Sequence, residues 1–251
     1  MGRSFDELVA RAVAAPIDGW DFSWLDGRAS EQRPSWGYQR LMSQRLAAAS
    51  AALDIDTGGG EVLAGATSFP PTMVATESWP PNAALATALL HPRGVVVVAT
   101  GDESTLPFAD EAFDLVTSRH ATVVHWREIA RVLRPGGSYL AQQIGPATMR
   151  ELFEFFLGPQ PAKWAELEPD TQTAQARAAG LEVVQMRMER LRSEFFDVGG
   201  IIYFLRKVIW TVPDFSVERY RERLHAMHER IETDGVFVAH ATRLLVEARK
   251  P

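Results

Sequence analysis

Short apolar runs alternate with helical stretches through the middle of the chain, and this alternation constrains the fold more than any other feature. Five such runs are rich in β-branched side chains and lack polar alternation; they lie at residues 52–55, 73–76, 95–99, 113–117 and 139–144. Runs of this kind are typical of parallel strands that helices cover on both faces. Helical stretches fall between them, at residues 61–65, 82–90 and 126–133. The alternation implies right-handed crossovers and therefore a doubly wound α/β sheet.

The two ends of the chain extend this pattern. Strands at residues 181–196 and 241–248 would bring the sheet to seven, and further helices are expected near residues 5–13, 38–51, 148–157, 171–179, 199–210 and 217–231. We therefore divide the chain into an N-terminal helical and aromatic lid segment (1–45), a core (46–196), a helical cap insertion (197–236) and the last core strand (237–251). The cap is expected over the carboxyl edge of the sheet, where open α/β sheets bind ligands.

Composition excludes several functional classes. The chain has 32 Asp and Glu against 26 Lys and Arg, a formal charge of −6, whereas a protein that grips nucleic acid by its phosphates normally has a basic excess. Without cysteine it can form neither disulfides nor thiolate metal sites, and no cluster resembles a metal site. The N-terminus carries Asp6 and Glu7, unlike a signal peptide, and no apolar run is long enough to span a bilayer. A cytoplasmic location is the default expectation.

A glycine-rich turn follows the first strand of the core. Gly58 and Gly60 remove side chains at a strand-to-helix turn, so the backbone there can approach a ligand closely, although a tight turn can also be purely structural. A dinucleotide fingerprint would need a third glycine at position 63, which is Leu63. A nicotinamide cofactor is therefore disfavoured.

Acidic residues follow the second and third strands. Glu77 ends the second strand, where a carboxylate can accept hydrogen bonds from both hydroxyls of a ribose, or can simply be a solvated residue that opens the next helix. Asp102 follows the third strand, where an acid can accept a hydrogen bond from the amine of an adenine. The glycine-rich turn, Glu77 and Asp102 follow three successive strands. Together they predict one crevice that holds an adenosine.

These motifs, in this order, resemble those of class I S-adenosylmethionine (SAM)-dependent methyltransferases, in particular a type 11-like, small-molecule branch. The resemblance covers about residues 50–145 and includes LDIDTGGG at 53–60, LPFADEAFDLV at 106–116 and RVLRPGG at 131–137. It implies a seven-stranded Rossmann-like sheet, SAM as cofactor and S-adenosylhomocysteine as product. The residues that it assigns to the cofactor are Asp54, Asp56, Gly58, Gly60, Glu77, Ser78, Asp102, Glu103 and Ser118.

One of these positions departs from the family pattern. Asp56 stands where the family usually has glycine. Aspartate tolerates unusual backbone angles better than most residues, so we expect the turn to be kept. Its carboxylate could also lie near the ammonium or sulfonium of the cofactor.

The resemblance implies in-line methyl transfer to an O, N or C atom of a small molecule, and no metal is required. His120, just after the fourth strand, is the candidate catalytic residue, either as a general base or only as a hydrogen-bonding contact to the substrate. Candidate substrate-binding residues are Arg119, Gln142, Tyr203, Trp24 and Trp36, although each aromatic alone could equally be core. The apolar stretch at residues 201–210 suggests a substrate with an apolar or aromatic part.

Two alternatives stay open. One is an RNA methyltransferase, although the fourth strand leads into Thr117-Ser118-Arg119-His120 and not into the Asp/Asn-Pro-Pro-aromatic motif of nucleic-acid amino-group methylases. The other is a non-catalytic protein with the same fold, which Asp56 alone favours. The substrate, the methylated atom and the choice between a monomer and a homo-oligomer are left open.

Overall fold

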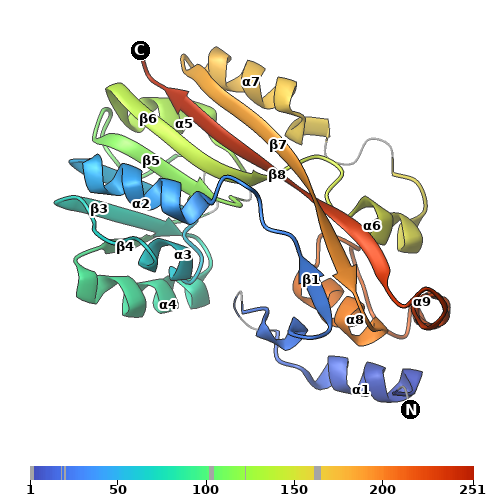
Figure 1. The fold of residues 1–251 in the computed structure, drawn as a ribbon. Coiled ribbons are helices and arrows are strands. Elements are labelled where there is room, and N and C mark those ends of the chain that lie inside the picture. The colour runs from blue at the N-terminus through green and yellow to red at the C-terminus, as the bar shows by residue number, and fades with distance from the viewer. Residues whose placement is uncertain (1–2, 18, 20, 102–104, 122, 161–164) are drawn as a thin grey trace. The chain divides into compact units, whose positions relative to one another are not determined.

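The protein is described from a computed structural model, which covers residues 3–17, 19, 21–101, 105–121, 123–160 and 165–251 (Figure 1). The chain divides into two compact units, and each is described by itself. The first unit comprises Met1–Arg33, Ala147–Lys163 and Arg190–Thr242, and the second comprises Pro34–Pro146, Trp164–Glu189 and Arg243–Pro251. The chain crosses between the units within two of its strands, β7 and β8.

The strands lie in the order β1-β7-β8-β6-β5-β2-β3-β4. Their bounds are β1 Ala29–Glu31, β2 Ala51–Ile55, β3 Thr72–Glu77, β4 Val96–Ala99, β5 Phe113–Arg119, β6 Leu133–Ile144, β7 Glu182–Phe195 and β8 Phe237–Arg249. Strands β2 to β6 pair in parallel, and β8 runs antiparallel to β6. The strand order reverses at β2, which has β3 on one side and β5 on the other. The carboxyl ends of these strands therefore surround a topological switch point, the usual ligand site of such sheets.

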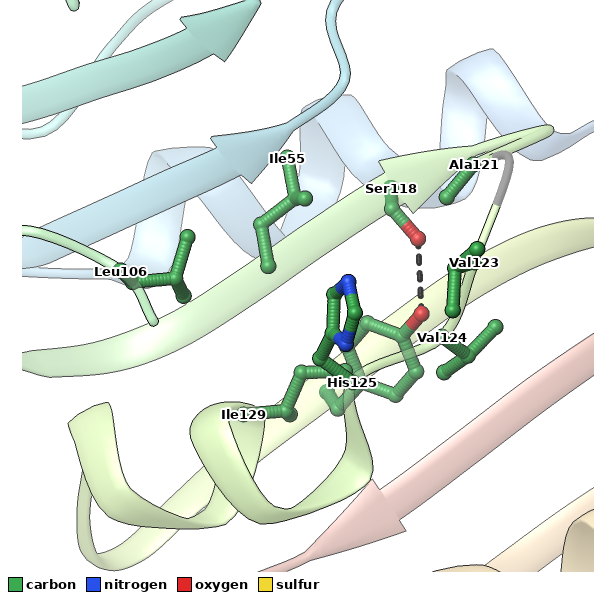
Figure 2. Close-up of a pocket in the computed structure, with 9 residues that line it drawn as sticks. Ile55, Leu106, Ser118, Ala121, Val123, Val124, His125 and Ile129 are labelled. Carbon is green, nitrogen blue, oxygen red and sulfur yellow. Dashed lines mark hydrogen bonds between the residues drawn. The ribbon is translucent and has the colours of Figure 1, made fainter. Parts of the chain in front are cut away.

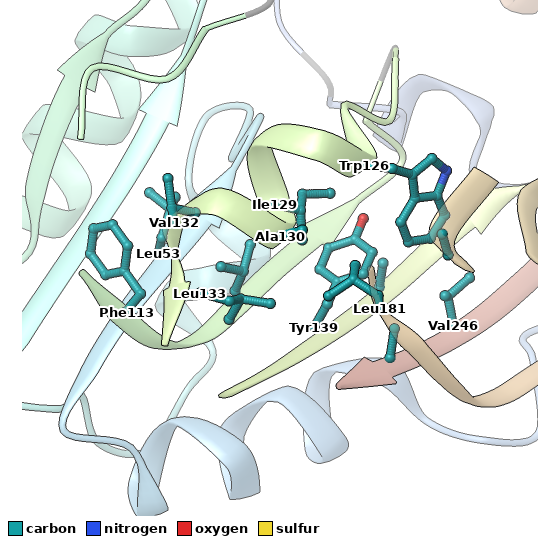
Figure 3. Close-up of a cluster of buried hydrophobic side chains, with 14 of the residues drawn as sticks. Leu53, Phe113, Trp126, Ile129, Ala130, Val132, Leu133, Tyr139, Leu181 and Val246 are labelled. Atoms are coloured by element: carbon teal, nitrogen blue, oxygen red, sulfur yellow. The ribbon is translucent and has the colours of Figure 1, made fainter. Parts of the chain in front are cut away.

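Helices cover both faces of the sheet in the second unit. The helices here are α2 Tyr38–Ala48, α3 Glu61–Ala64, α4 Pro80–Leu90, α5 Trp126–Val132 and α7 Pro169–Ala178, with 3-10 turns at His91–Arg93 and Ala165–Leu167. Successive strand residues point to opposite faces. Leu53 and Val116 belong to the buried cluster that includes Trp126 of α5, and Figure 3 shows this cluster, whereas Ala52 and Leu115 belong to the cluster that includes residues of α2 and α4. Burial on both faces explains why β2 and β5 read as continuous apolar runs, whereas the apolar run of β4 is only partly buried.

The first unit contains helices α1 Phe5–Ala14, α6 Arg150–Leu157, α8 Val198–Lys207 and α9 Arg221–Asp234, with a 3-10 turn at Ser23–Leu25. Helix α1 lies close against α8. A Cβ on Gly199 would stand only 3.2 Å from the carbonyl oxygen of Leu8. Asp197 caps α8 by accepting the N–H of Gly200 at 2.8 Å, and it forms an ion pair with Arg28 at 3.0 Å.

All seven predicted strands are present, and the fold is the α/β arrangement that we expected. The sheet has an eighth strand among the described residues, β1, which pairs antiparallel with β7. Its three residues Ala29, Ser30 and Glu31 have no strand-like pattern of their own, so only pairing with β7 makes them a strand. The predicted helices at 199–210 and 217–231 both lie between β7 and β8. No helix in the described part of the chain combines the length and apolarity needed to cross a membrane.

Candidate functional site

The turn after β2 is built on left-handed backbone angles. Asp56, Gly58 and Gly60 have φ values of 54°, 64° and 86°. This region is open to glycine, and aspartate is among the few other residues that enter it readily, which explains how Asp56 can replace a glycine here. Gly60 is also required for packing, because a Cβ there would lie 2.9 Å from Cδ1 of Leu90 and 3.3 Å from Cα of Ala86.

The carboxylate of Glu77 connects this turn to the end of β3. One of its oxygens accepts the backbone N–H of Gly58 at 2.7 Å, and the other accepts that of Trp79 at 2.9 Å. Glu77 is buried, and burial raises its pKa above the ordinary value while these hydrogen bonds oppose the rise. A carboxylate has about four lone-pair positions, so each oxygen keeps capacity for one more donor, such as a ribose hydroxyl. Ser78, between Glu77 and Trp79, is half-buried.

Asp54 lies at the neighbouring strand ends, beside Thr117. The hydroxyl of Thr117 donates to the Asp54 carboxylate at 2.6 Å, and the two residues are register partners in β2 and β5. Burial raises the pKa of Asp54 to about 6, although the hydrogen bond from Thr117 works against the rise. An ionised Asp54 would therefore be costly in the absence of a compensating positive charge.

A buried polar atom near this edge supports the binding of a polar ligand. Among the described residues, Oδ1 of Asn82 has no hydrogen-bond partner. Asn82 lies in the first turn of α4, shortly after Glu77. Buried polar atoms without a partner are rare in proteins, and a bound ligand is one of the accepted explanations. The donors and acceptors present thus fit the hydroxyl and amino groups of SAM.

The end of β4 lies beside Glu77. Ala99 is its register partner, and the N–H of Thr100 donates to the Glu77 carbonyl at 3.0 Å. The predicted cofactor residues Asp102 and Glu103 lie outside the described residues.

Ser118 is differently placed from the other predicted cofactor residues. Its hydroxyl is hydrogen-bonded to the hydroxyl of Tyr139 at 2.7 Å, and its carbonyl accepts the hydroxyl of Tyr38 at 2.8 Å. The Ser118 side chain faces a cavity of about 20 Å³, also lined by Ile55, Leu106, Ala121, Val123, Val124, His125, Ile129 and Tyr139 (Figure 2). Such a volume holds about one water molecule. The sequence did not indicate the roles of Tyr38, Thr117 and Tyr139, although hydroxyl groups inside apolar runs were a signal.

Three of the predicted substrate-side residues come together. Gln142 accepts the indole N–H of Trp36 at 2.8 Å, and its amide nitrogen lies 3.1 Å from Nε2 of His120. His120 has φ 59°, and its own N–H donates to the carbonyl of Gln142 at 2.8 Å. Burial lowers the pKa of His120 well below the ordinary value, and the charges of Arg119 and Arg243 add to this effect.

The other predicted substrate residues are distributed differently. Arg119 is exposed beside His120. Trp24 and Tyr203 belong to the first unit, where their rings stack with centroids 4.8 Å apart and the hydroxyl of Tyr203 donates to the carbonyl of Asp21 at 3.1 Å. The apolar residues of α8, such as Ile201, are buried within this unit, whereas Ile209 and Trp210 at the end of the same apolar stretch are exposed.

Comparison with known proteins shows what part of the chain and its fold are similar to. Residues 53–141 match the family model described as a methyltransferase domain. A candidate methyltransferase from Bacillus halodurans is similar in structure, with a TM-score of 0.60 and 21% identity over 85% of this chain and 98% of that one. A SAM-dependent methyltransferase from Thiobacillus denitrificans, solved with S-adenosylhomocysteine, gives 0.52 and 17% over 86% and 92%. The cyclase SpnF gives 0.54 and 18% over 98% and 92%. At these identities the shared property is the fold, and no curated protein sequence matches the chain.

Proposed function

We propose that this chain, whose residues 53–141 match a methyltransferase-domain family model, is a class I SAM-dependent methyltransferase that transfers a methyl group from SAM to an O, N or C atom of a small molecule. The cofactor supplies a methyl group on a positively charged sulfur, which is already a strong electrophile. The task left to the protein is to hold the acceptor atom in line behind that methyl group and to exclude water. Positioning of this kind can lower a barrier by roughly 7–11 kcal/mol in favourable cases.

The hydrogen bond from the backbone N–H of Gly58 to the carboxylate of Glu77 is the observation that carries this proposal. The two backbone donors fix the orientation of the Glu77 carboxylate before any ligand arrives, so little ordering is needed when a ribose binds. The glycine turn beside it allows the backbone to approach the methionine part of the cofactor. Asp54, near the end of β2, and Asp56, in the turn that follows, add negative charge beside it. This charge complements a ligand that carries a sulfonium and an ammonium.

On the acceptor side, we assign the substrate to the carboxyl ends of β5 and β6. His120 follows β5 directly and is the residue placed to meet the acceptor, as a base or as a hydrogen-bonding contact. The formal charge of −6 provides no general attraction for a phosphate backbone, which favours a small molecule over RNA as the acceptor.

Isothermal titration calorimetry with SAM and S-adenosylhomocysteine tests the cofactor assignment. We expect both to bind with micromolar dissociation constants; no detectable binding by the folded protein would leave the non-catalytic alternative. Transfer of radiolabelled methyl groups from SAM to a small-molecule extract and to total RNA then tests the acceptor. Label in RNA, together with RNA binding that weakens steeply with salt, would contradict the small-molecule assignment.

A further inference from the structure

A buried chain of hydrogen bonds runs from Trp36 through Gln142 to His120. The indole N–H of Trp36 contacts Oε1 of Gln142 at 2.8 Å, and Nε2 of Gln142 contacts Nε2 of His120 at 3.1 Å. An indole nitrogen can only donate, so the Gln142 atom that faces Trp36 must be the oxygen. The atom that faces His120 is therefore the amide nitrogen, which also only donates. It follows that Nε2 of His120 accepts.

We propose that Trp36 and Gln142 are positioning residues that hold His120 in the tautomer with its proton on Nδ1. In the methyl transfer proposed above, on which this part rests, His120 then donates a hydrogen bond to the substrate from Nδ1. It does not remove a proton from the substrate, because the lone pair of Nε2 is already used by Gln142. The substrate would present a hydrogen-bond acceptor here, such as a carbonyl, carboxylate or phenolate oxygen.

The surroundings prevent the donor and acceptor roles in this series of hydrogen bonds from reversing. Trp36 and Gln142 are each only 4% exposed, so water cannot replace a lost partner. If the amide of Gln142 rotated by half a turn, its NH₂ group would face the indole N–H, and two buried donors would oppose each other. If His120 were protonated, its Nε2–H would meet the NH₂ group of Gln142 in the same way.

Two further features agree with a neutral, fixed imidazole. His120 has the left-handed φ of 59°, and its N–H donates to the Gln142 carbonyl at 2.8 Å, so backbone and side chain are both tied to Gln142. An uncommon backbone conformation held in this way is typical of functional positions. Burial and the guanidinium groups of Arg119 and Arg243 disfavour the imidazolium form. Among the described residues, Nδ1 of His120 has no hydrogen-bond partner, which leaves this donor available to a substrate.

Nitrogen chemical shifts of the histidine rings test the proposal on the full-length protein, without substrate. Long-range ¹H–¹⁵N correlation spectra of the ¹⁵N-histidine-labelled protein distinguish protonated from unprotonated ring nitrogens. The His120 signals are identified by their loss in His120→Asn. We expect a protonated Nδ1 and an unprotonated Nε2, unchanged from about pH 5.5 to about pH 8. A proton on Nε2, a mixture of tautomers, or titration near the ordinary histidine pKa would overturn the proposal.

Two variants test the direction of the hydrogen bonds from Trp36 through Gln142 to His120. In Gln142→Glu, both carboxylate oxygens accept, so the proton should move to Nε2 of His120 and the pKa of the ring should rise. Trp36→Phe removes the donor that orients the amide, and both tautomers should appear. If either folded variant kept the wild-type pattern, Trp36 and Gln142 would not set the tautomer. Because the tautomer is measured without cofactor, its failure is distinct from a failure to bind SAM, which would overturn the proposed function.

Discussion

The carboxylate of Glu77, at the end of β3, accepts the backbone N–H of Gly58, in the turn after β2, at 2.7 Å. The acid and the glycine turn are therefore one structural unit and not two separate contributors to a crevice. The second backbone bond, from Trp79 at 2.9 Å, completes the orientation of the carboxylate. A change at Glu77 should consequently affect both the ribose acceptor and the shape of the turn.

We expect Glu77→Ala to weaken binding of SAM and S-adenosylhomocysteine by about 1.5–3 kcal/mol, the range for a hydrogen bond to a charged group. Calorimetry measures this directly. Asp114→Asn is the matched control, because Asp114 also accepts two backbone N–H groups, from Ser50 and Ala51, but at the amino ends of β2 and β5. It should lower stability and leave cofactor affinity unchanged. Wild-type affinity in folded Glu77→Ala would count against the ribose assignment.

Asp54 should make stability depend on pH in an unusual direction. Its pKa is about 6 in the folded protein against an ordinary 3.8, so the folded state holds a proton more tightly than the unfolded chain. This contribution favours folding below about pH 4 and is lost as the pH rises through about 6. Asp54→Asn can still accept the Thr117 hydroxyl, and it should be more stable than wild type at about pH 8 by up to ~3 kcal/mol, but not at about pH 4. Urea unfolding at both pH values checks this; an equal difference at both would contradict the buried-acid interpretation.

We expect Asp56 to lower the stability of the free protein and to raise its affinity for SAM. Its φ of 54° suits glycine better than aspartate, so Asp56→Gly should stabilise the free protein by roughly 0.5–1 kcal/mol. Loss of the carboxylate should also lower the pKa values of Asp54 and Glu77, which its charge raises. We expect weaker SAM binding in the same variant, because a negative charge near the cationic ligand is removed. Asp56→Ala serves as the control, since it removes the charge and keeps the backbone strain. Thermal unfolding and calorimetry measure the two effects, and tighter SAM binding by Asp56→Gly would contradict a contact with the cofactor's positive groups.

Ser118 should matter for stability and not for the cofactor. Its hydroxyl is buried and bonded to Tyr139, so Ser118→Ala should cost about 1 kcal/mol of unfolding free energy and leave SAM affinity unchanged. Tyr139→Phe leaves the Ser118 hydroxyl without this partner and also removes a bond from Gln143, so its cost should be larger, about 1–3 kcal/mol. Urea unfolding measures the stability of both variants, and calorimetry measures their affinity for SAM. A tenfold loss of SAM affinity in Ser118→Ala at unchanged stability would support the prediction that Ser118 binds the cofactor.

Strands β2 to β8 could be predicted because each has a local sequence signature, whereas β1 was missed because its three residues have none. The hydrogen-bond partners of side chains were harder to predict, because they depend on how segments distant in the sequence are aligned in the fold. Trp36, Gln142 and His120 were predicted as separate substrate contacts, but 106 residues separate the first pair that the structure joins. The burial of Ser118 could have been predicted, because this residue is two positions beyond Val116 and so shares its core-facing side of β5.

Gly60 allows the packing contribution of the glycine turn to be measured apart from backbone strain. Gly60 and Gly94 have nearly the same φ, 86° and 82°, but a Cβ on Gly94 would have no neighbour within 4 Å, whereas one on Gly60 would press on Leu90 and Ala86. Gly94→Ala should therefore cost about 1–2 kcal/mol through strain alone. Gly60→Ala should cost roughly 1–3 kcal/mol more, because Gly60, the residue just before α3, and the facing part of α4 must move apart. Since this movement also displaces the neighbouring Gly58, we expect SAM affinity to fall in Gly60→Ala only. Equal losses of stability in the two variants, measured by urea unfolding, would show that the turn does not need the close approach of α4.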